Sequence, residues 1–169
     1  MGFKHIPFGS AAKFNVVIEI PKGSQNKYEH DEELDVMKLD WVFTGDFKFI
    51  FDYGFVPQTR GGDGDMLDAF VLTSHSLTQG VVVECRAIGM IELLDRGEVD
   101  DKILAVPIAD RNYEKVRELS ELDFDYEQTF RDFFKKLGVQ KDKVYEIKGF
   151  KGSNEAKREL TKAHERFAK

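Results

Sequence analysis

Short runs of β-branched and aromatic residues follow one another through the first two thirds of the chain, and this pattern constrains the fold most. Turn-forming residues separate the runs, as Pro21-Lys22-Gly23 does after the first. Such runs predict strands. We expect them over residues 14–20, 27–30, 34–43, 46–56, 69–73, 81–95 and 102–108, with the second and third forming a hairpin.

Two of these runs carry further signals. In residues 46–56, aromatic side chains recur at every second position, which predicts one face of a strand. They are Phe47, Phe49, Phe51 and Tyr53. Gly89 interrupts the longest run and predicts a β-bulge or a bend in a barrel.

The last third of the chain changes to a helical period. One helical face is predicted by the spacing of Tyr126, Phe130, Phe133, Phe134 and Leu137. Gly138 is the expected end of this helix, and residues 144–150 read as a short strand. Ser153 is the expected cap of a final helix, with Glu155 in its first turn. The apolar stripe of that helix is Ala156, Leu160, Ala163 and Phe167. Strands followed by helices indicate an α+β fold, with a small closed barrel and helices packed outside it.

Length, charge and cysteine content narrow the class of protein. The 169 residues contain no Pro/Gly/Ser-rich linker, so we expect one domain over residues 1–169. A net charge of −6 and a pI near 5.3 disfavour a general nucleic-acid binder, which needs basic surface. Cys85 is the sole cysteine, which excludes an intrachain disulfide and a thiolate zinc cluster. Neither a secretory leader nor an apolar run of membrane-spanning length is recognisable, so we expect a cytoplasmic protein without membrane association.

An acidic cluster in the stretch GGDGDMLDAF, residues 61–70, raises two alternatives. Asp63, Asp65 and Asp68 lie within six positions, just before an apolar run. The cluster could be a solvated hairpin turn or part of a cation site. It does not fit the calcium-binding EF-hand loop, because Leu67 and Ser74 occupy the fifth and twelfth positions of that template.

A second acidic cluster, in LLDRGEVDDK at residues 93–102, also follows a predicted strand. It contains Asp95, Glu98, Asp100 and Asp101. Strand ends meet at one mouth of a barrel, so the two clusters could share a site, and Glu19 could join them from an apolar strand. Such an all-oxygen set suits Mg²⁺ or Mn²⁺. Nearby phosphate could be bound by Lys27, Lys102, Lys135, Lys143 or Lys148. Each cluster taken alone is better explained as a solvated turn, and only their joint arrangement favours a cation site.

The residues of both clusters resemble the family I soluble inorganic pyrophosphatases. Their signature is D-[SGDN]-D-[PE]-[LIVMF]-D-[LIVMGAC], and residues 63–69 match it except at Met66. Further blocks agree in order and spacing: VVIEIPKGSQNKYE (16–29), DYGFVPQT (52–59), GMIELLDRGEVDDKILAVP (89–107) and FFKKL (133–137). The resemblance covers roughly residues 14 to 168. It implies a five-stranded OB-like closed β-barrel with flanking α-helices, and a homo-oligomer, which is a hexamer in many bacterial members.

The resemblance also implies roles for individual residues. Asp65 would be the general base or would position the attacking water. The Mg²⁺ ligands, with Mn²⁺ as an alternative ion, would be Glu19, Asp63, Asp68, Asp95 and Asp100. The residues that contact the pyrophosphate substrate would be Lys27, Glu29, Tyr53, Lys102 and Lys135. The implied reaction is metal-dependent hydrolysis of pyrophosphate to two phosphates.

Three departures from the family pattern fall on its phosphate-binding positions. Trp41 stands where the family has an arginine, and Phe49 and Phe134 stand where it has tyrosines. We therefore expect weakened pyrophosphate binding, compensation by another cation such as Arg60, or a different phosphoanhydride substrate such as polyphosphate or a nucleotide. A non-enzymatic OB-like module that binds single-stranded nucleic acid is a further alternative, which the acidic composition disfavours.

Overall fold

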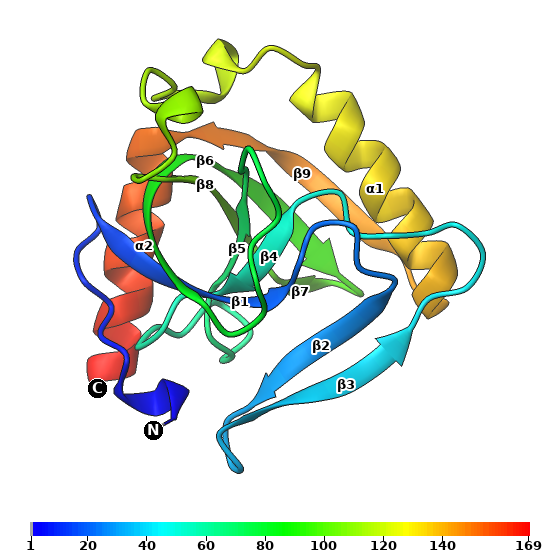
Figure 1. Cartoon of the computed structure of the whole chain (residues 1–169), viewed down its shortest axis with the longest axis horizontal. Helices are drawn as coiled ribbons and strands as arrows, with labels where there is room; N and C mark the ends of the chain where they lie inside the picture. Colours follow the sequence, from blue (N-terminus) through cyan, green and yellow to red (C-terminus); the bar gives the residue numbers. More distant parts are fainter. Residues whose placement is uncertain (1) are drawn as a thin grey trace.

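A large, strongly bent sheet and two long helices make up most of the chain (Figure 1). The computed structural model describes residues 2–169. Its main sheet contains β1 (Phe14–Ile20), β4 (Asp52–Phe55), β5 (Asp68–Val71), β6 (Val82–Asp95), β7 (Glu98–Val99), β8 (Lys102–Pro107) and β9 (Tyr145–Gly152). A separate hairpin is formed by β2 (Asn26–Asp31) and β3 (Val36–Val42). The α-helices are α1 (Tyr126–Lys141) and α2 (Ser153–Ala168), and the 3₁₀-helices are η1 (Phe3–His5), η2 (Arg111–Tyr113) and η3 (Leu119–Glu121). The α+β class predicted from the sequence is confirmed.

Five strands of the main sheet pair in a ring. β1 pairs with β4, β4 with β5, β5 with β8, β8 with β6, and β6 again with β1. β6 can serve two neighbours and also β9 because it is long and bends. The bend coincides with a register shift between Ala87 and Gly89, which confirms the predicted bulge. A Cβ on Gly89 would lie 2.7 Å from the Lys151 carbonyl oxygen, so only glycine allows β9 to approach so closely.

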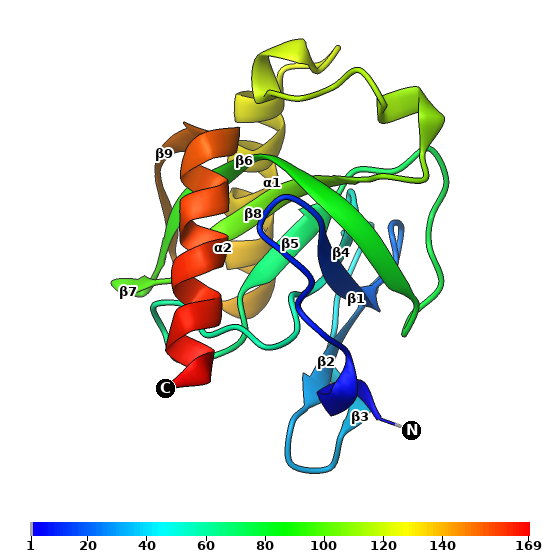
Figure 2. The same ribbon diagram turned by 90° about the vertical axis from the view of Figure 1, so that its left-hand side faces the viewer.

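The two α-helices pack on different parts of the main sheet (Figures 1 and 2), and they contribute to different apolar clusters. α2 contributes Ala156, Leu160 and Ala163 to one cluster. α1 packs a phenylalanine-rich face onto the other cluster, with Phe130, Phe133, Phe134 and Leu137 buried. Burying such side chains stabilises the fold by about 1.5–3 kcal/mol each. This packing holds the C-terminal end of α1 beside the β2–β3 hairpin, where Gln140 accepts a 2.8 Å hydrogen bond from the Thr44 amide.

The predicted strand over residues 46–56 is shorter than expected. Only Asp52–Phe55 is extended and paired, whereas the preceding segment is irregular. Its alternating aromatic side chains pack on α1 instead of following a sheet: the rings of Phe47 and Phe49 lie 5.7 and 5.1 Å from that of Phe133. The alternation of aromatic residues therefore reflects packing against a helix as well as pairing in a sheet.

Three predictions for the helices were wrong in detail. Gly138 is buried inside α1, and the helix continues to Lys141, where the C-cap residue Asp142 adopts the left-handed conformation with φ of 50°. Ser153 is the first residue of α2 rather than its cap, and its hydroxyl hydrogen-bonds Glu118. Phe167 is 42% exposed and lies beside Arg60 rather than in the apolar stripe. None of the helices in residues 2–169 has the length and apolar character needed to cross a membrane.

Candidate active site

The loop between β4 and β5 carries the first acidic cluster. Gly64 has a φ of 87°, which glycine adopts readily, and the Gly61 amide donates a 2.7 Å hydrogen bond to the Asp65 carbonyl. The Asp65 amide in turn donates to the Asp63 carboxylate at 3.0 Å. This tight turn leaves the side chains of Asp63 and Asp65 exposed and places Asp68 at the first position of β5.

A cleft of about 450 Å³ brings most of the predicted site residues together. Its lining residues come from the ring of strands, the β2–β3 hairpin and the end of α1, elements that can be located in Figure 1. Ten of the predicted residues line it: Glu19, Lys27, Glu29, Tyr53, Asp63, Asp65, Asp68, Asp95, Asp100 and Lys102. Lys135 is not among them, because it is exposed on another face of α1 beside Val139.

Lys102 is the central cation of the acidic side of this cleft. Its Nζ donates to Asp68 at 2.7 Å, to Asp100 at 2.9 Å and to the Tyr53 hydroxyl at 2.8 Å. Tyr53 donates its own proton to Asp68 at 2.6 Å. Burial acts to lower the pKa of Lys102, but the surrounding oxygens outweigh it and hold the pKa well above its usual value. Lys102 is therefore a fixed positive charge.

The position of Lys102 follows from strand register. β5 and β8 pair in parallel with Asp68 opposite Lys102, and Asp100 lies two residues before Lys102. Parallel pairing puts the starts of both strands at the same edge of the sheet. The two acidic clusters therefore meet here, which is one of the two alternatives that the sequence left open.

Glu19 is a buried carboxyl on the floor of the same cleft. It is 6% exposed, and its carboxylate accepts a 2.7 Å hydrogen bond from the His30 amide. Burial, and then the negative charge of Asp68, raises the pKa of Glu19 to about 8. One backbone donor does not replace the lost water, so Glu19 favours its protonated form until a further cation arrives.

The exposed carboxylates of the turn also repel one another. Partial loss of water, followed by repulsion from Asp100, Asp65 and Asp68, raises the pKa of Asp63 to about 6. The pKa of Asp65 is raised by the same kind of partial burial and then by Asp68. This crowding of like charge marks a site that favours a cation.

The acidic side of the cleft fits a hard divalent cation in donor type and in charge. Its candidate ligands are carboxylate oxygens, which suit Mg²⁺ and Mn²⁺. Within residues 2–169, no three His, Cys, Asp or Glu side chains already converge on one point. The Lys102 ammonium lies between Asp68 and Asp100 instead and supplies the compensating charge.

The basic side of the cleft is formed by the β2–β3 hairpin and the segment that ends α1. Lys27 pairs with Asp40 at 2.7 Å, and Lys143 pairs with Asp95 at 2.7 Å. Lys141 lies between these elements with its Nζ 3.9 Å from Asp40. Arg60, the compensating cation suggested by the sequence, does not line the cleft and pairs with Glu32 at 3.0 Å.

Lys141 and Asp40 are two charged cleft residues that the sequence analysis missed; it also did not name Tyr28, His30, Glu32, Arg96 and Tyr145, which line the cleft as well. Lys141 falls two turns after Phe134, on the same helical face, so the apolar period itself could have revealed it. It was overlooked because the helix was expected to end at Gly138. Asp40 had no signal beyond its position in an alternating strand.

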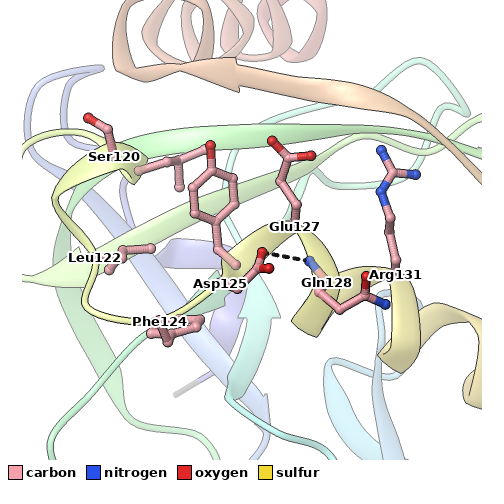
Figure 3. A pocket seen from close by; sticks show the side chains of 9 residues that line it. Ser120, Leu122, Phe124, Asp125, Glu127, Gln128 and Arg131 are labelled. Atoms are coloured by element: carbon pink, nitrogen blue, oxygen red, sulfur yellow. Dashed lines mark hydrogen bonds between the residues drawn. The ribbon is translucent and has the colours of Figure 1, made fainter.

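A second cavity, of about 440 Å³, lies at the other end of α1 (Figure 3). It surrounds the cap of that helix, where the Asp125 side chain accepts a 3.1 Å hydrogen bond from the Gln128 amide. It shares no lining residue with the cleft described above and contains none of the predicted site residues.

Comparison with known proteins agrees with this geometry. The family model of inorganic pyrophosphatase matches residues 16–168. The chain belongs to the inorganic pyrophosphatase family. An inorganic pyrophosphatase of Thermoplasma volcanium is 42% identical over 153 residues, which cover 89% of this chain and 90% of that protein. One from Synechocystis is 40% identical over 141 residues, or 83% of each chain. The crystal structure of inorganic pyrophosphatase from Thermus thermophilus superposes with a TM-score of 0.92 at 33% identity and covers all of both chains.

The three residues that depart from the family pattern, Trp41, Phe49 and Phe134, differ in whether they line the cleft. Phe49 and Phe134 line it and are 3% and 4% exposed, so they contribute packing. Trp41 does not line it and is 39% exposed on β3, opposite Lys27 in the hairpin. The Lys141 Nζ lies 5.5 Å from the centre of the Trp41 ring.

Proposed function

We propose that the chain hydrolyses inorganic pyrophosphate to two phosphates in the cleft between the ring of strands and the β2–β3 hairpin. The observation that carries the proposal is that Asp63, Asp65, Asp68 and Asp100 line one cleft in a member of the inorganic pyrophosphatase family, with Lys102 between Asp68 and Asp100. Phosphoryl transfer requires positioning and charge stabilisation more than covalent chemistry, and this cleft offers both charge signs within one small volume.

Divalent cations would be held by Glu19, Asp63, Asp68, Asp95 and Asp100, with Mg²⁺ as the first candidate and Mn²⁺ as the second. When bound, such cations neutralise phosphate oxygens and lower the pKa of water. The raised pKa values of Glu19 and Asp63 support this assignment, because both carboxyls lack a full complement of positive charge in the free protein.

Asp65 would accept the proton of the attacking water. As the water oxygen bonds to one phosphorus, the bridging oxygen would leave with the second phosphate. Asp65 is exposed to incoming water, and its raised pKa makes it a better proton acceptor near neutral pH than an ordinary aspartate. Lys102 and Tyr53 would stabilise the charge that develops on phosphate oxygens, and Lys27 with Glu29 would orient the far phosphoryl group.

Nucleotide hydrolysis is the weaker alternative. The ring of Trp41 could stack on a base, which favours this alternative, but the Lys141 ammonium already lies close to that ring. Binding of single-stranded nucleic acid is disfavoured because carboxylates crowd the cleft. The ring of five strands supports an OB-like closed barrel, and the family resemblance supports a cytoplasmic homo-oligomer.

Phosphate release from pyrophosphate tests the proposal. We expect release with Mg²⁺, none with excess EDTA, and a loss of at least about a hundredfold in the Asp65→Asn variant. Asp46→Asn is the matched control, because Asp46 is exposed outside the cleft. An Asp65→Asn variant as active as wild type would remove Asp65 from the mechanism, and an inactive wild type would refute the proposed function itself.

A further inference from the structure

Lys141 occupies an unusual position at the basic side of the cleft. It is the last residue of α1 and lines the cleft, and its side chain is 15% exposed. Its nearest carboxylate is Asp40 at 3.9 Å, which is already bound to Lys27 at 2.7 Å. Within residues 2–169, no acceptor lies at hydrogen-bonding distance and angle from the Lys141 Nζ. A largely enclosed ammonium with this little compensation favours an incoming anion.

The neighbouring charges strengthen this preference. Burial, and then repulsion from Lys27 and Lys143, lowers the pKa of Lys141. Lys143 is paired with Asp95 at 2.7 Å, so Asp40 is left to serve both Lys27 and Lys141. Lys27 has a second carboxylate, that of Glu29 at 3.7 Å, and Lys143 has Asp95, so Lys141 is the least compensated of the three ammonium groups.

The surroundings of Lys141 hold it in place. The side-chain amide of Gln140 ties the helix end to the segment after β3. Its oxygen accepts a 2.8 Å hydrogen bond from the Thr44 backbone N–H, and its nitrogen donates a 3.0 Å hydrogen bond to the Thr44 carbonyl. The Trp41 ring, 5.5 Å from Nζ, contributes a cation–π contact. Lys141 therefore reaches the cleft from a fixed helix end and not from a free loop.

We propose that Lys141 is a substrate-contacting residue that binds a phosphoryl oxygen of pyrophosphate, with the Trp41 ring fixing its ammonium at the hairpin side of the cleft. The inference rests on the proposed function and names the cation that takes up the far end of the substrate. Lys141 thereby sets the affinity for the dianionic end group and does not take part in proton transfer.

Steady-state kinetics of Lys141→Gln test this role. We expect KM for pyrophosphate to rise by about tenfold or more while kcat changes by less than about threefold, because the lost contact is made to bound substrate. Lys141→Arg should recover most of the KM. Lys136→Gln is the matched control, an exposed lysine on the same helix that lines neither the cleft nor the cavity at the other end of α1. A KM unchanged in Lys141→Gln, or a rise that Lys141→Arg does not reverse and that accompanies a lower melting temperature, would overturn the inference.

Trp41 provides a readout that does not depend on turnover. It is the sole tryptophan of the chain, so its fluorescence reports on its own surroundings. Titration with imidodiphosphate, a non-hydrolysable pyrophosphate analogue, should change the emission of wild type and Lys136→Gln, with a midpoint at least about tenfold higher in Lys141→Gln. If wild type releases no phosphate, the proposed function fails, but this titration still decides whether Lys141 binds the anion. Equal midpoints in wild type and Lys141→Gln would refute the contact.

Discussion

The acidic and basic sides of the cleft are built in different ways. On the acidic side, Asp68 and Lys102 face each other in the paired strands β5 and β8, so backbone hydrogen bonds fix their separation. On the basic side, Lys27 lies on a two-stranded hairpin and Lys141 on the last turn of a helix, joined by side-chain contacts alone. Strand register holds a site more firmly than contacts between side chains do. We therefore expect the acidic side to control the rate of the reaction and the basic side to adjust affinity.

The largest effect should come from the acidic side. Asp68→Asn keeps the shape of the side chain but removes the charge that receives hydrogen bonds from both Tyr53 and Lys102. We expect kcat for pyrophosphate to fall by about a hundred- to a thousandfold, as when other preorganised charges are removed from active sites. The rate of phosphate release measures this, with Asp46→Asn as control. A loss below about tenfold would show that the acidic side does not govern the rate.

The same crowding predicts a pH-dependent stability. The pKa of Glu19 is about 8 in the folded chain against 4.5 for the ordinary group, so the folded state binds more protons than the unfolded state between these values. The free energy of unfolding in EDTA should therefore fall as the pH rises from about 5 to about 8, with a contribution from Glu19 of a few kcal/mol.

Urea unfolding at both pH values measures this effect. Glu19→Gln cannot lose a proton, so its stability should depend less on pH than that of wild type. Added Mg²⁺ should restore stability to wild type at pH 8, since it favours the ionised carboxylate. The same pH slope in wild type and Glu19→Gln would show that Glu19 is not the responsible group.

The sequence indicated that the two acidic clusters could meet in one site, and the reasons are physical. Both clusters follow strands, so their meeting depends on strand pairing, and the apolar runs that form β1, β6 and β8 begin and end within about one residue of the predicted bounds. The residues concerned are also close along the chain: Asp100 precedes Lys102 by two positions. Within each cluster, residues that are close along the chain are therefore also close in the folded protein.

The basic side depended on features that no local pattern shows. Whether α1 ends at Gly138 or continues to Lys141 is decided by tertiary packing: a Cβ at Gly138 would lie 2.5 Å from the Lys143 carbonyl oxygen, so glycine serves a close approach there and not a helix stop. Likewise, the aromatic alternation of residues 46–51 reflects packing on α1. Neither outcome could be read from spacing, because glycine and alternating aromatics each fit two structures.

Trp41→Arg gives a smaller and more specific test of the basic side. Position 41 lies on β3 opposite Lys27. In the Lys141→Gln background, Trp41→Arg therefore places a guanidinium close to where the Lys141 ammonium lies in wild type. We expect it to bring KM for pyrophosphate back to within about threefold of wild type, because a guanidinium makes charge-assisted hydrogen bonds to phosphate. Trp41→Phe in the same background is the control and should not lower KM. If Trp41→Arg leaves KM as high as in Lys141→Gln, the two positions do not serve the same phosphoryl group.

The smallest effect should come from Lys135, for which resemblance and structure make opposite predictions. Resemblance to the family implies a phosphate contact, whereas the structure places Lys135 on the exposed side of α1, away from the face that carries Phe134 and Lys141. Lys135→Gln should therefore change KM by less than about twofold, because an exposed lysine contributes little to binding at a distance. KM values for Lys135→Gln and Lys141→Gln, measured side by side, make the comparison. If KM rose tenfold in Lys135→Gln and not in Lys141→Gln, α1 would have to rotate about its axis when substrate binds, so that Lys135 faces the cleft. We expect the opposite result, a larger KM in Lys141→Gln than in Lys135→Gln. The phosphate-binding cation is then Lys141, near the end of the helix, where its contact with Trp41 holds it.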